Sequence, residues 1–206
     1  LAAAVEDDNS VVLINTASGK VLDRIKVEGR NPEHAVFSPD GHWIYVSAEE
    51  AQQVDVINVA ERRQTASIPV GKRPRGIVFL ADGSRAYVAC ELAGKVYAID
   101  VANQKVLAEI NAGKFPNGLA AHPNGRQVFV SNGRDATVMA IDTASNSIVA
   151  TIEVGKRPWN MAITPDGRRL YVANLRTQSV SVNDTEALRR IADIGVGELP
   201  WGVVIR

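Results

Sequence analysis

Five short segments, each directly after a proline, carry the side chains best suited to chemistry. They recur at steps of 42 residues, and their members are Glu33 with His34, Arg75, Asn117, Trp159 and Trp201. A carboxylate, an imidazole, a guanidinium and an amide at one place could supply the base, acid and oxyanion-stabilising groups of a hydrolysis. Two tryptophans and an arginine at one place could instead stack on a planar ligand or on nucleobases. The chemistry depends on whether the fold brings these segments together.

Basic residues stand directly before or beside the same prolines. They are Arg30, Lys72, Arg73, Arg75, Lys114, Lys156 and Arg157, whereas Glu198 and Leu199 break the pattern in the last segment. Like charges that converge on a narrow opening would focus an anionic ligand there. A simpler interpretation is that these side chains are solvated loop charges whose stems cover neighbouring segments.

A repeat of 42 residues positions these segments. Each unit has a glycine, a proline three residues later, a turn such as SPDG or PDG, and two alternating apolar runs; the full units span 29–70, 71–112, 113–154 and 155–196. Repeats of about 40 residues that hold several short strands indicate a solenoid or a β-propeller. The turn glycine supplies the positive φ of a tight hairpin, and the proline suits the first residue of an inner edge strand.

We predict four strands, A to D, in each unit, at 159–164, 169–174, 179–183 and 190–195 in the last one. Residues 1–28 look like the later part of a unit and residues 197–206 like the start of one. The chain is therefore predicted to be a single all-β domain over 1–206, a β-propeller with five four-stranded blades. The fifth blade would mix both termini, with the C-terminal strand innermost, so that no edge stays unpaired. The alternative is a part of a longer, seven-bladed propeller.

Composition sets few limits on function. The chain has 206 residues, of which 46% are apolar and 22% charged, and its 23 basic and 23 acidic side chains cancel. No apolar run is long enough to span a membrane, so no membrane insertion is expected. Cys90 is the only cysteine. It lies in an apolar strand, where a small buried residue is expected rather than a reactive thiol.

The strand-B segments carry a family resemblance. YVSA (45–48), YVAC (87–90), FVSN (129–132) and YVAN (171–174), with VGKRPRGI (70–77) and VGKRPWNM (154–161), resemble the YVTN-repeat β-propeller family. That family is similar to surface-layer propellers, to exported propellers associated with quinone-cofactor-dependent catabolism, and more remotely to propeller lactonases and haem-bearing propellers. The resemblance implies the fold and a periplasmic or extracellular location. It implies no single activity, because one fold hosts many functions.

In this fold the D–A and B–C loops share the face around the mouth of the central channel. The B–C loops carry mostly acidic residues, among them Glu49, Glu50, Glu91 and Asp135. We therefore expect a cationic inner ring inside an acidic rim. His34 would lie at the mouth, whereas His42 and His122 would lie on the opposite face, so the three cannot converge on one metal.

No established catalytic motif is present, and a single cysteine excludes a c-type haem. No catalytic residue, metal or cofactor is therefore assigned. The leading interpretation is a monomeric, non-enzymatic binding scaffold that meets a protein partner or an anionic ligand at the basic D–A loops, through His34, Arg75, Asn117 and the residues named above. One alternative is a single-stranded nucleic-acid binder that uses Trp159 and Trp201. The other is an enzyme or cofactor carrier, lactonase-like or haem-related, built around His34 and Arg75.

Overall fold

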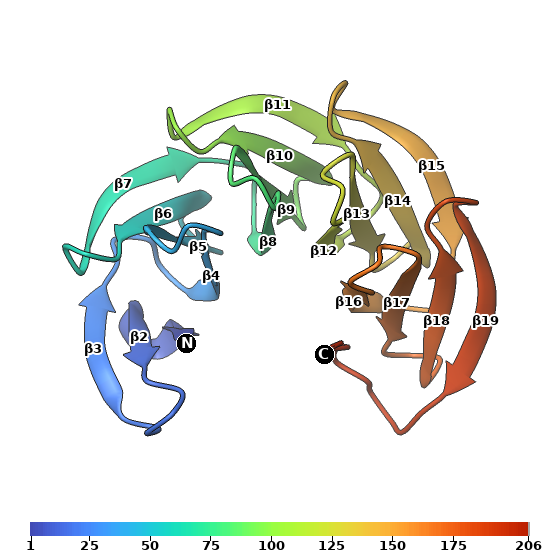
Figure 1. Cartoon of the computed structure of the whole chain (residues 1–206), viewed down its shortest axis with the longest axis horizontal. Helices are drawn as coiled ribbons and strands as arrows, with labels where there is room; N and C mark the ends of the chain where they lie inside the picture. Colours follow the sequence, from blue (N-terminus) through green and yellow to red (C-terminus); the bar gives the residue numbers. More distant parts are fainter. Residues whose placement is uncertain (206) are drawn as a thin grey trace.

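The chain folds into five antiparallel β-sheets that follow one another along an open arc (Figure 1). The computed structural model describes residues 1–205. The first sheet has three strands and each of the following sheets has four. We call these sheets blades 1 to 5 in chain order. The inner strands line the inside of the arc and the last strand of each blade forms its outside (Figure 1).

The strands have the following bounds. Blade 1 contains β1 (Ala2–Val5), the 3-10 turn η1 (Glu6–Asp8), β2 (Ser10–Ile14) and β3 (Val21–Lys26). Blade 2 contains β4 (Pro32–Phe37), β5 (Trp43–Ala48), β6 (Gln53–Asn58) and β7 (Arg63–Pro69). Blade 3 contains β8 (Pro74–Phe79), β9 (Arg85–Cys90), β10 (Lys95–Asp100) and β11 (Lys105–Asn111). Blade 4 contains β12 (Pro116–Ala121), β13 (Gln127–Asn132), β14 (Thr137–Asp142) and β15 (Ser147–Glu153). Blade 5 contains β16 (Pro158–Ile163), β17 (Arg169–Asn174), β18 (Ser179–Asp184) and β19 (Arg189–Gly195).

These bounds confirm the strands predicted from the repeat to within one residue at each end. The repeated proline is the first residue of every inner strand from β4 to β16, where it interrupts no ladder. The turn glycines Gly41, Gly83, Gly125 and Gly167 all have positive φ, between 71° and 76°, as the hairpin requires.

The hydrophobic core lies between successive blades. The middle strands are buried on both faces, which explains their continuous apolar runs: β9 is buried from Ala86 to Cys90. Between blades 2 and 3, the Tyr45 ring packs edge-on against Phe79 with centroids 4.9 Å apart. The outermost strands β7, β11 and β15 alternate exposed and partly buried residues, since only one side of each meets a neighbour, whereas β19 at the end of the arc is exposed throughout. Blades therefore stack through their side-chain layers and position the loops on each face.

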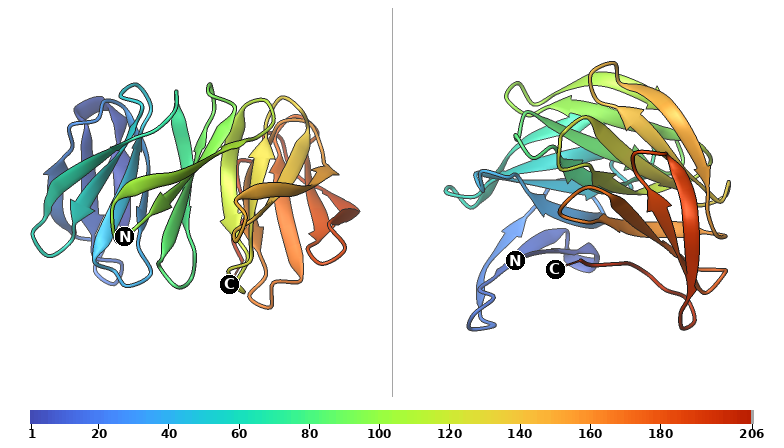
Figure 2. Two further views of the ribbon diagram at one scale, coloured as in Figure 1. Left: turned by 90° about the horizontal axis from the view of Figure 1, so that it is seen from above. Right: turned by 45° about the vertical axis from the view of Figure 1, so that its right-hand side comes forward.

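The predicted mixed blade is not formed. Blade 1 has only β1, β2 and β3, and residues 196–205 form no strand. The C-terminal segment lies instead beside blade 5, where the Trp201 ring packs on Trp159 with centroids 5.0 Å apart. Figure 1 and the left view of Figure 2 both separate the two ends of the chain. The prediction of closure by both termini is therefore wrong for this structure, because residues 196–205 pair with no strand of blade 1.

The two ends of the arc carry exposed apolar side chains, as expected of blades with one neighbour. They include Val21 and Leu22 on blade 1 and Ile194, Leu199, Trp201 and Val204 at the other end. Within the described residues, no helix is long and apolar enough to cross a membrane.

Candidate functional site

The residues that follow the repeated prolines form a chain of contacts across the inside of the arc. Glu33 Oε1 lies 2.7 Å from Arg75 Nη1. The Arg75 guanidinium lies over the Trp159 ring, 5.9 Å from its centroid, and Trp159 contacts Trp201. Asn117 is buried beneath them, at 4% exposure, and its Nδ2 has no hydrogen-bond partner among the described residues. The fold thus brings together the five segments identified from the sequence.

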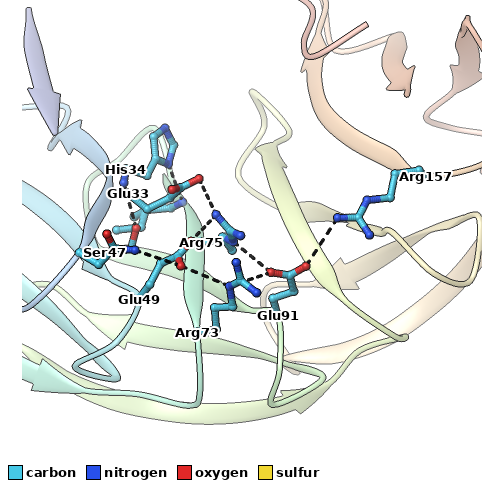
Figure 3. A network of polar contacts seen from close by, with 10 residues as sticks. Glu33, His34, Ser47, Glu49, Arg73, Arg75, Glu91 and Arg157 are labelled. Carbon is cyan, nitrogen blue, oxygen red and sulfur yellow. Dashed lines mark hydrogen bonds and ion pairs between the residues drawn. The ribbon is translucent and has the colours of Figure 1, made fainter. Parts of the chain in front are cut away.

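Arg75 is the centre of an ion-pair network (Figure 3). Its Nε donates to Glu91 Oε2 at 3.0 Å, and its Nη1 contacts Glu33 and Glu49. The Arg75 side chain is 11% exposed, that of Glu49 9% and that of Glu91 3%. Burial alone would lower the pKa of Arg75, but the nearby carboxylates, Glu33 first, outweigh it and raise this pKa. Arg75 is therefore a fixed cation among three anions.

Two further arginines close the network at its edges. Arg73 Nε lies 3.3 Å from both Glu49 and Glu91, and Arg157 Nη2 lies 3.9 Å from Glu91. Arg73 and Arg157 both precede a proline and have left-handed backbone conformations, with φ of 59° and 57°. Such values are rare outside glycine and persist where the surrounding structure enforces them. The same backbone geometry recurs at Asn31, Phe115 and Leu199, so it belongs to the repeated loop. Both guanidinium groups lie close to Glu91 (Figure 3).

The acidic residues of this network correct the expected charge pattern. Glu49 and Glu91 are the first residues after β5 and β9, and they turn inward instead of forming an outer rim. The inner arginines are therefore paired with carboxylates. The lysines Lys72, Lys114 and Lys156 are exposed at the edge of the same face.

His34 lies on β4, next to Glu33, and is accessible from the inside of the arc. Its Nδ1 accepts a hydrogen bond from the Ile77 N–H of β8 at 3.1 Å. The neutral ring therefore carries its proton on Nε2, which is free to donate. The surrounding protein partly desolvates the ring and lowers its pKa, although the charge of Glu33 opposes this shift. His34 is thus a neutral hydrogen-bond donor at the mouth.

The two tryptophans differ in access. Trp159 is 6% exposed, and the Arg157 guanidinium lies 4.8 Å from its ring centroid. Two guanidinium groups and the Trp201 ring thus cover Trp159. Trp201 is 60% exposed. A planar ligand therefore has access to Trp201 alone of this pair.

The remaining histidines lie in the hairpin turns at the opposite end of the inner strands. His42 Nδ1 is 3.0 Å from Asp40, and His122 Nδ1 accepts from the Asn124 N–H. Across residues 1–205, no three His, Cys, Asp or Glu side chains are grouped to hold a metal ion. A cavity of about 630 Å³ also lies on this turn face, lined by exposed residues such as Asn124 and Asp166. It lies at the other end of the strands from the buried network, so the mouth is the stronger candidate.

Sequence reasoning named His34, Arg75 and Arg157 but missed the roles of Glu49 and Glu91. A signal was present, because these glutamates occupy one position of the repeat, 42 residues apart, and the next units have Gly133 and Leu175 there. A charge that some units carry and others replace with an uncharged residue indicates a function specific to the blades that carry it.

The comparisons with known proteins agree with the fold. The family model "Lactonase, 7-bladed beta-propeller" matches residues 59–187. A crystal structure of a functionally unknown protein from Desulfotomaculum acetoxidans is 18% identical, with a TM-score of 0.90 over 100% of this chain and 68% of that one. Hydrazine synthase of Kuenenia stuttgartiensis is also 18% identical, with a TM-score of 0.70 over 96% of this chain and 83% of that one. No curated protein matches the sequence.

At 18% identity, the two solved structures show the fold alone. They confirm the β-propeller predicted from the repeat, while the YVTN-repeat identity stays a prediction. The family match spans more than half of the sequence and includes Arg73, Arg75, Glu91 and Arg157. The chain therefore belongs to the lactonase family of seven-bladed β-propellers.

Proposed function

We propose that the chain hydrolyses a cyclic ester at the mouth of the arc. The observation that carries this proposal is the contact between Glu33 and Arg75 at 2.7 Å, with His34 next to Glu33 on β4. Ester hydrolysis needs a base for the attacking water and donors for the oxyanion that forms on the carbonyl oxygen. The family match supports the same reaction class.

Each group has a role that its surroundings suit. Glu33 is the most accessible carboxylate of the network, with a side-chain exposure of 22% against 9% for Glu49 and 3% for Glu91. It takes the proton of the attacking water. Arg75 and the His34 Nε2–H stabilise the tetrahedral oxyanion, and none of the three carboxylate contacts of Arg75 uses its Nη2. The ring C–O bond then breaks, and the leaving alkoxide takes the proton from Glu33 to give a hydroxy acid.

The two less accessible glutamates, Glu49 and Glu91, have a positioning role. Glu49 and Glu91 hold Arg75 from below, so its guanidinium keeps one orientation without substrate. Such preorganisation lowers the cost of stabilising charge in the transition state. Asn117 is buried below this layer and takes no part in the reaction.

The experiment is a screen of the purified protein against γ-, δ- and ε-lactones of differing polarity, with acid release followed by a pH indicator. We expect ring opening above the spontaneous rate for at least one class of lactone. Glu50→Gln is the control variant. Glu50 follows Glu49 on the loop after β5, its side chain is 60% exposed, and its substitution should leave full activity. Absence of turnover with every lactone would refute the proposal.

A second candidate is the binding scaffold predicted from the sequence. The observation that favours it is the exposure of Trp201 at 60% and Leu199 at 67% at the edge of the same face, since exposed aromatic and apolar residues often anchor partners. Trp201→Ser would abolish partner binding but leave lactone hydrolysis intact. The two functions are thus separable by one variant.

A further inference from the structure

A cavity of about 500 Å³ lies between blades 4 and 5 on the mouth face. Its lining residues are Gly133, Ala136, Arg134, Lys156, Arg157 and Arg176. Four of these side chains are cationic and none is acidic. Like charges that line one cavity repel one another, and an anion bound among them would offset this repulsion.

The loops that carry the four cations are held by backbone hydrogen bonds. Arg176 N–H donates to Lys156 C=O at 3.1 Å, and Leu175 N–H donates to Arg157 C=O at 3.0 Å. Arg134 N–H donates in the same way to Lys114 C=O at 3.1 Å. The B–C loop and the D–A loop of each blade therefore form one rigid edge of the cavity.

Aromatic rings hold two of the guanidinium groups without neutralising them. The Arg134 guanidinium lies 3.9 Å from the Phe115 ring centroid, and that of Arg157 lies 4.8 Å from the Trp159 centroid. A guanidinium that stacks on an aromatic ring keeps its N–H donors at the edge available. The only ion pair of the cluster among residues 1–205 is the 3.9 Å contact of Arg157 with Glu91. The cluster thus keeps most of its positive charge.

The repeat supplies two internal references for this cavity. Equivalent positions between blades 3 and 4 hold Leu92, Lys114, Phe115 and Arg134, and those between blades 2 and 3 hold Glu50, Lys72, Arg73 and Leu92. The cavities at these junctions are lined by carboxylates as well as cations. Only the junction of blades 4 and 5 has four cations at the four positions.

The loops of blades 4 and 5 also lack the glutamate that pairs with arginines at the other junctions, although Glu91 of blade 3 still contacts Arg157 at 3.9 Å. Glu49 and Glu91 neutralise Arg73 and Arg75, but the same repeat position is Gly133 in blade 4 and Leu175 in blade 5. Two changes, the gain of cations and the loss of glutamates, therefore act in the same direction at one junction. If these cations were only solvated loop charges, there would be no reason for the gain of cations and the loss of glutamates to occur at the same junction.

We propose that this cavity binds a small phosphate-type oxyanion, either inorganic or carried as a phosphate ester. Arginine forks match the paired oxygens of a phosphoryl group, and the lysine adds a mobile donor. A volume of about 500 Å³ suits a small ligand better than a polymer. The site is distinct from the Glu33–Arg75 pair, so it stands whether or not the chain hydrolyses lactones.

The test is calorimetric titration of the whole chain with sodium pyrophosphate at low ionic strength. We expect one saturable site, and Arg134→Gln and Arg176→Gln should each weaken binding about tenfold or more. Lys72→Gln is the matched control, because Lys72 occupies the position of Lys156 at another junction and its loss should change nothing. Binding should also change the Trp159 fluorescence, since Arg157 lies over that ring.

Titrations with other ligands distinguish inorganic phosphate from a phosphate ester and a small ligand from a polymer. Glycerol phosphate binding tighter than inorganic phosphate would identify an ester as the ligand, and equal binding would identify the phosphoryl group alone. The proposal is overturned if pyrophosphate shows no saturable binding, or if Arg134→Gln and Arg176→Gln bind it as tightly as the unmodified chain. It is also overturned if Lys72→Gln weakens binding as much as these two substitutions do. A single-stranded oligonucleotide that binds more tightly than pyrophosphate would also overturn it.

Discussion

Replacing Arg75 with methionine should destabilise the chain strongly at neutral pH. Arg75 is 11% exposed and contacts Glu33, Glu49 and Glu91, of which Glu91 is buried and Glu49 largely so, with a side-chain exposure of 9%. Methionine keeps the apolar stem but leaves the carboxylates without their cation. Breaking a buried pair by removing one partner typically costs about 3–5 kcal/mol. For a chain of this size, that corresponds to a fall in Tm of about 6–20 °C.

The assay is urea and thermal unfolding at pH 7, followed by circular dichroism. Arg30→Met is the control: Arg30 and Glu50 are 3.9 Å apart with exposures of 72% and 60%, and such surface pairs contribute about 0–1 kcal/mol. If Arg75→Met and Arg30→Met lower the free energy of unfolding equally at pH 7, the ion-pair network does not stabilise the fold.

Three further outcomes follow from the geometry. Burial raises the pKa of the Cys90 thiol to about 12, so iodoacetamide should alkylate Cys90 only after unfolding; modification of the native chain at pH 8 would contradict its burial. Gly155→Ala should cost about 1–3 kcal/mol, because an added Cβ would lie 2.6 Å from Asn174, whereas Gly197→Ala meets nothing within 4 Å and should be neutral by urea unfolding. Burial lowers the pKa of His34 from 6.5, and protonation of Nδ1 would break its hydrogen bond to the Ile77 N–H. The rate of hydrolysis should therefore stay constant as the pH is lowered to 6.5 and decrease only at lower pH. A decrease that starts above pH 6.5 would contradict this role of His34.

Most of the fold could be predicted from the sequence because the repeat acts locally. The proline at the start of each inner strand and the glycine of each hairpin have backbone requirements that hold in every blade, so strand bounds followed from their spacing. Closure could not be predicted in the same way. Whether residues 197–205 pair with blade 1 or lie beside blade 5 depends on tertiary contacts such as Trp201 with Trp159, which no repeat pattern specifies.

The site was predictable in its basic and aromatic members and less so in its acidic ones. Arg75 and Trp159 stood out because they vary at a fixed position of the repeat. Glu49 and Glu91 were assigned to an outer rim since loops after strand B lead away from the axis, yet both side chains turn inward to meet Arg75. The direction of a side chain in a loop depends on its partner, and for Glu49 that partner belongs to another blade.

The most direct test of catalysis at the mouth is kcat/KM for the best lactone with Glu33→Gln. The substitution keeps the size of the side chain but removes the base, and general bases contribute about 100-fold or more. We predict a loss of at least that order in kcat/KM with an unchanged circular dichroism spectrum. A Glu33→Gln protein that hydrolyses the lactone as fast as the unmodified chain would contradict the account.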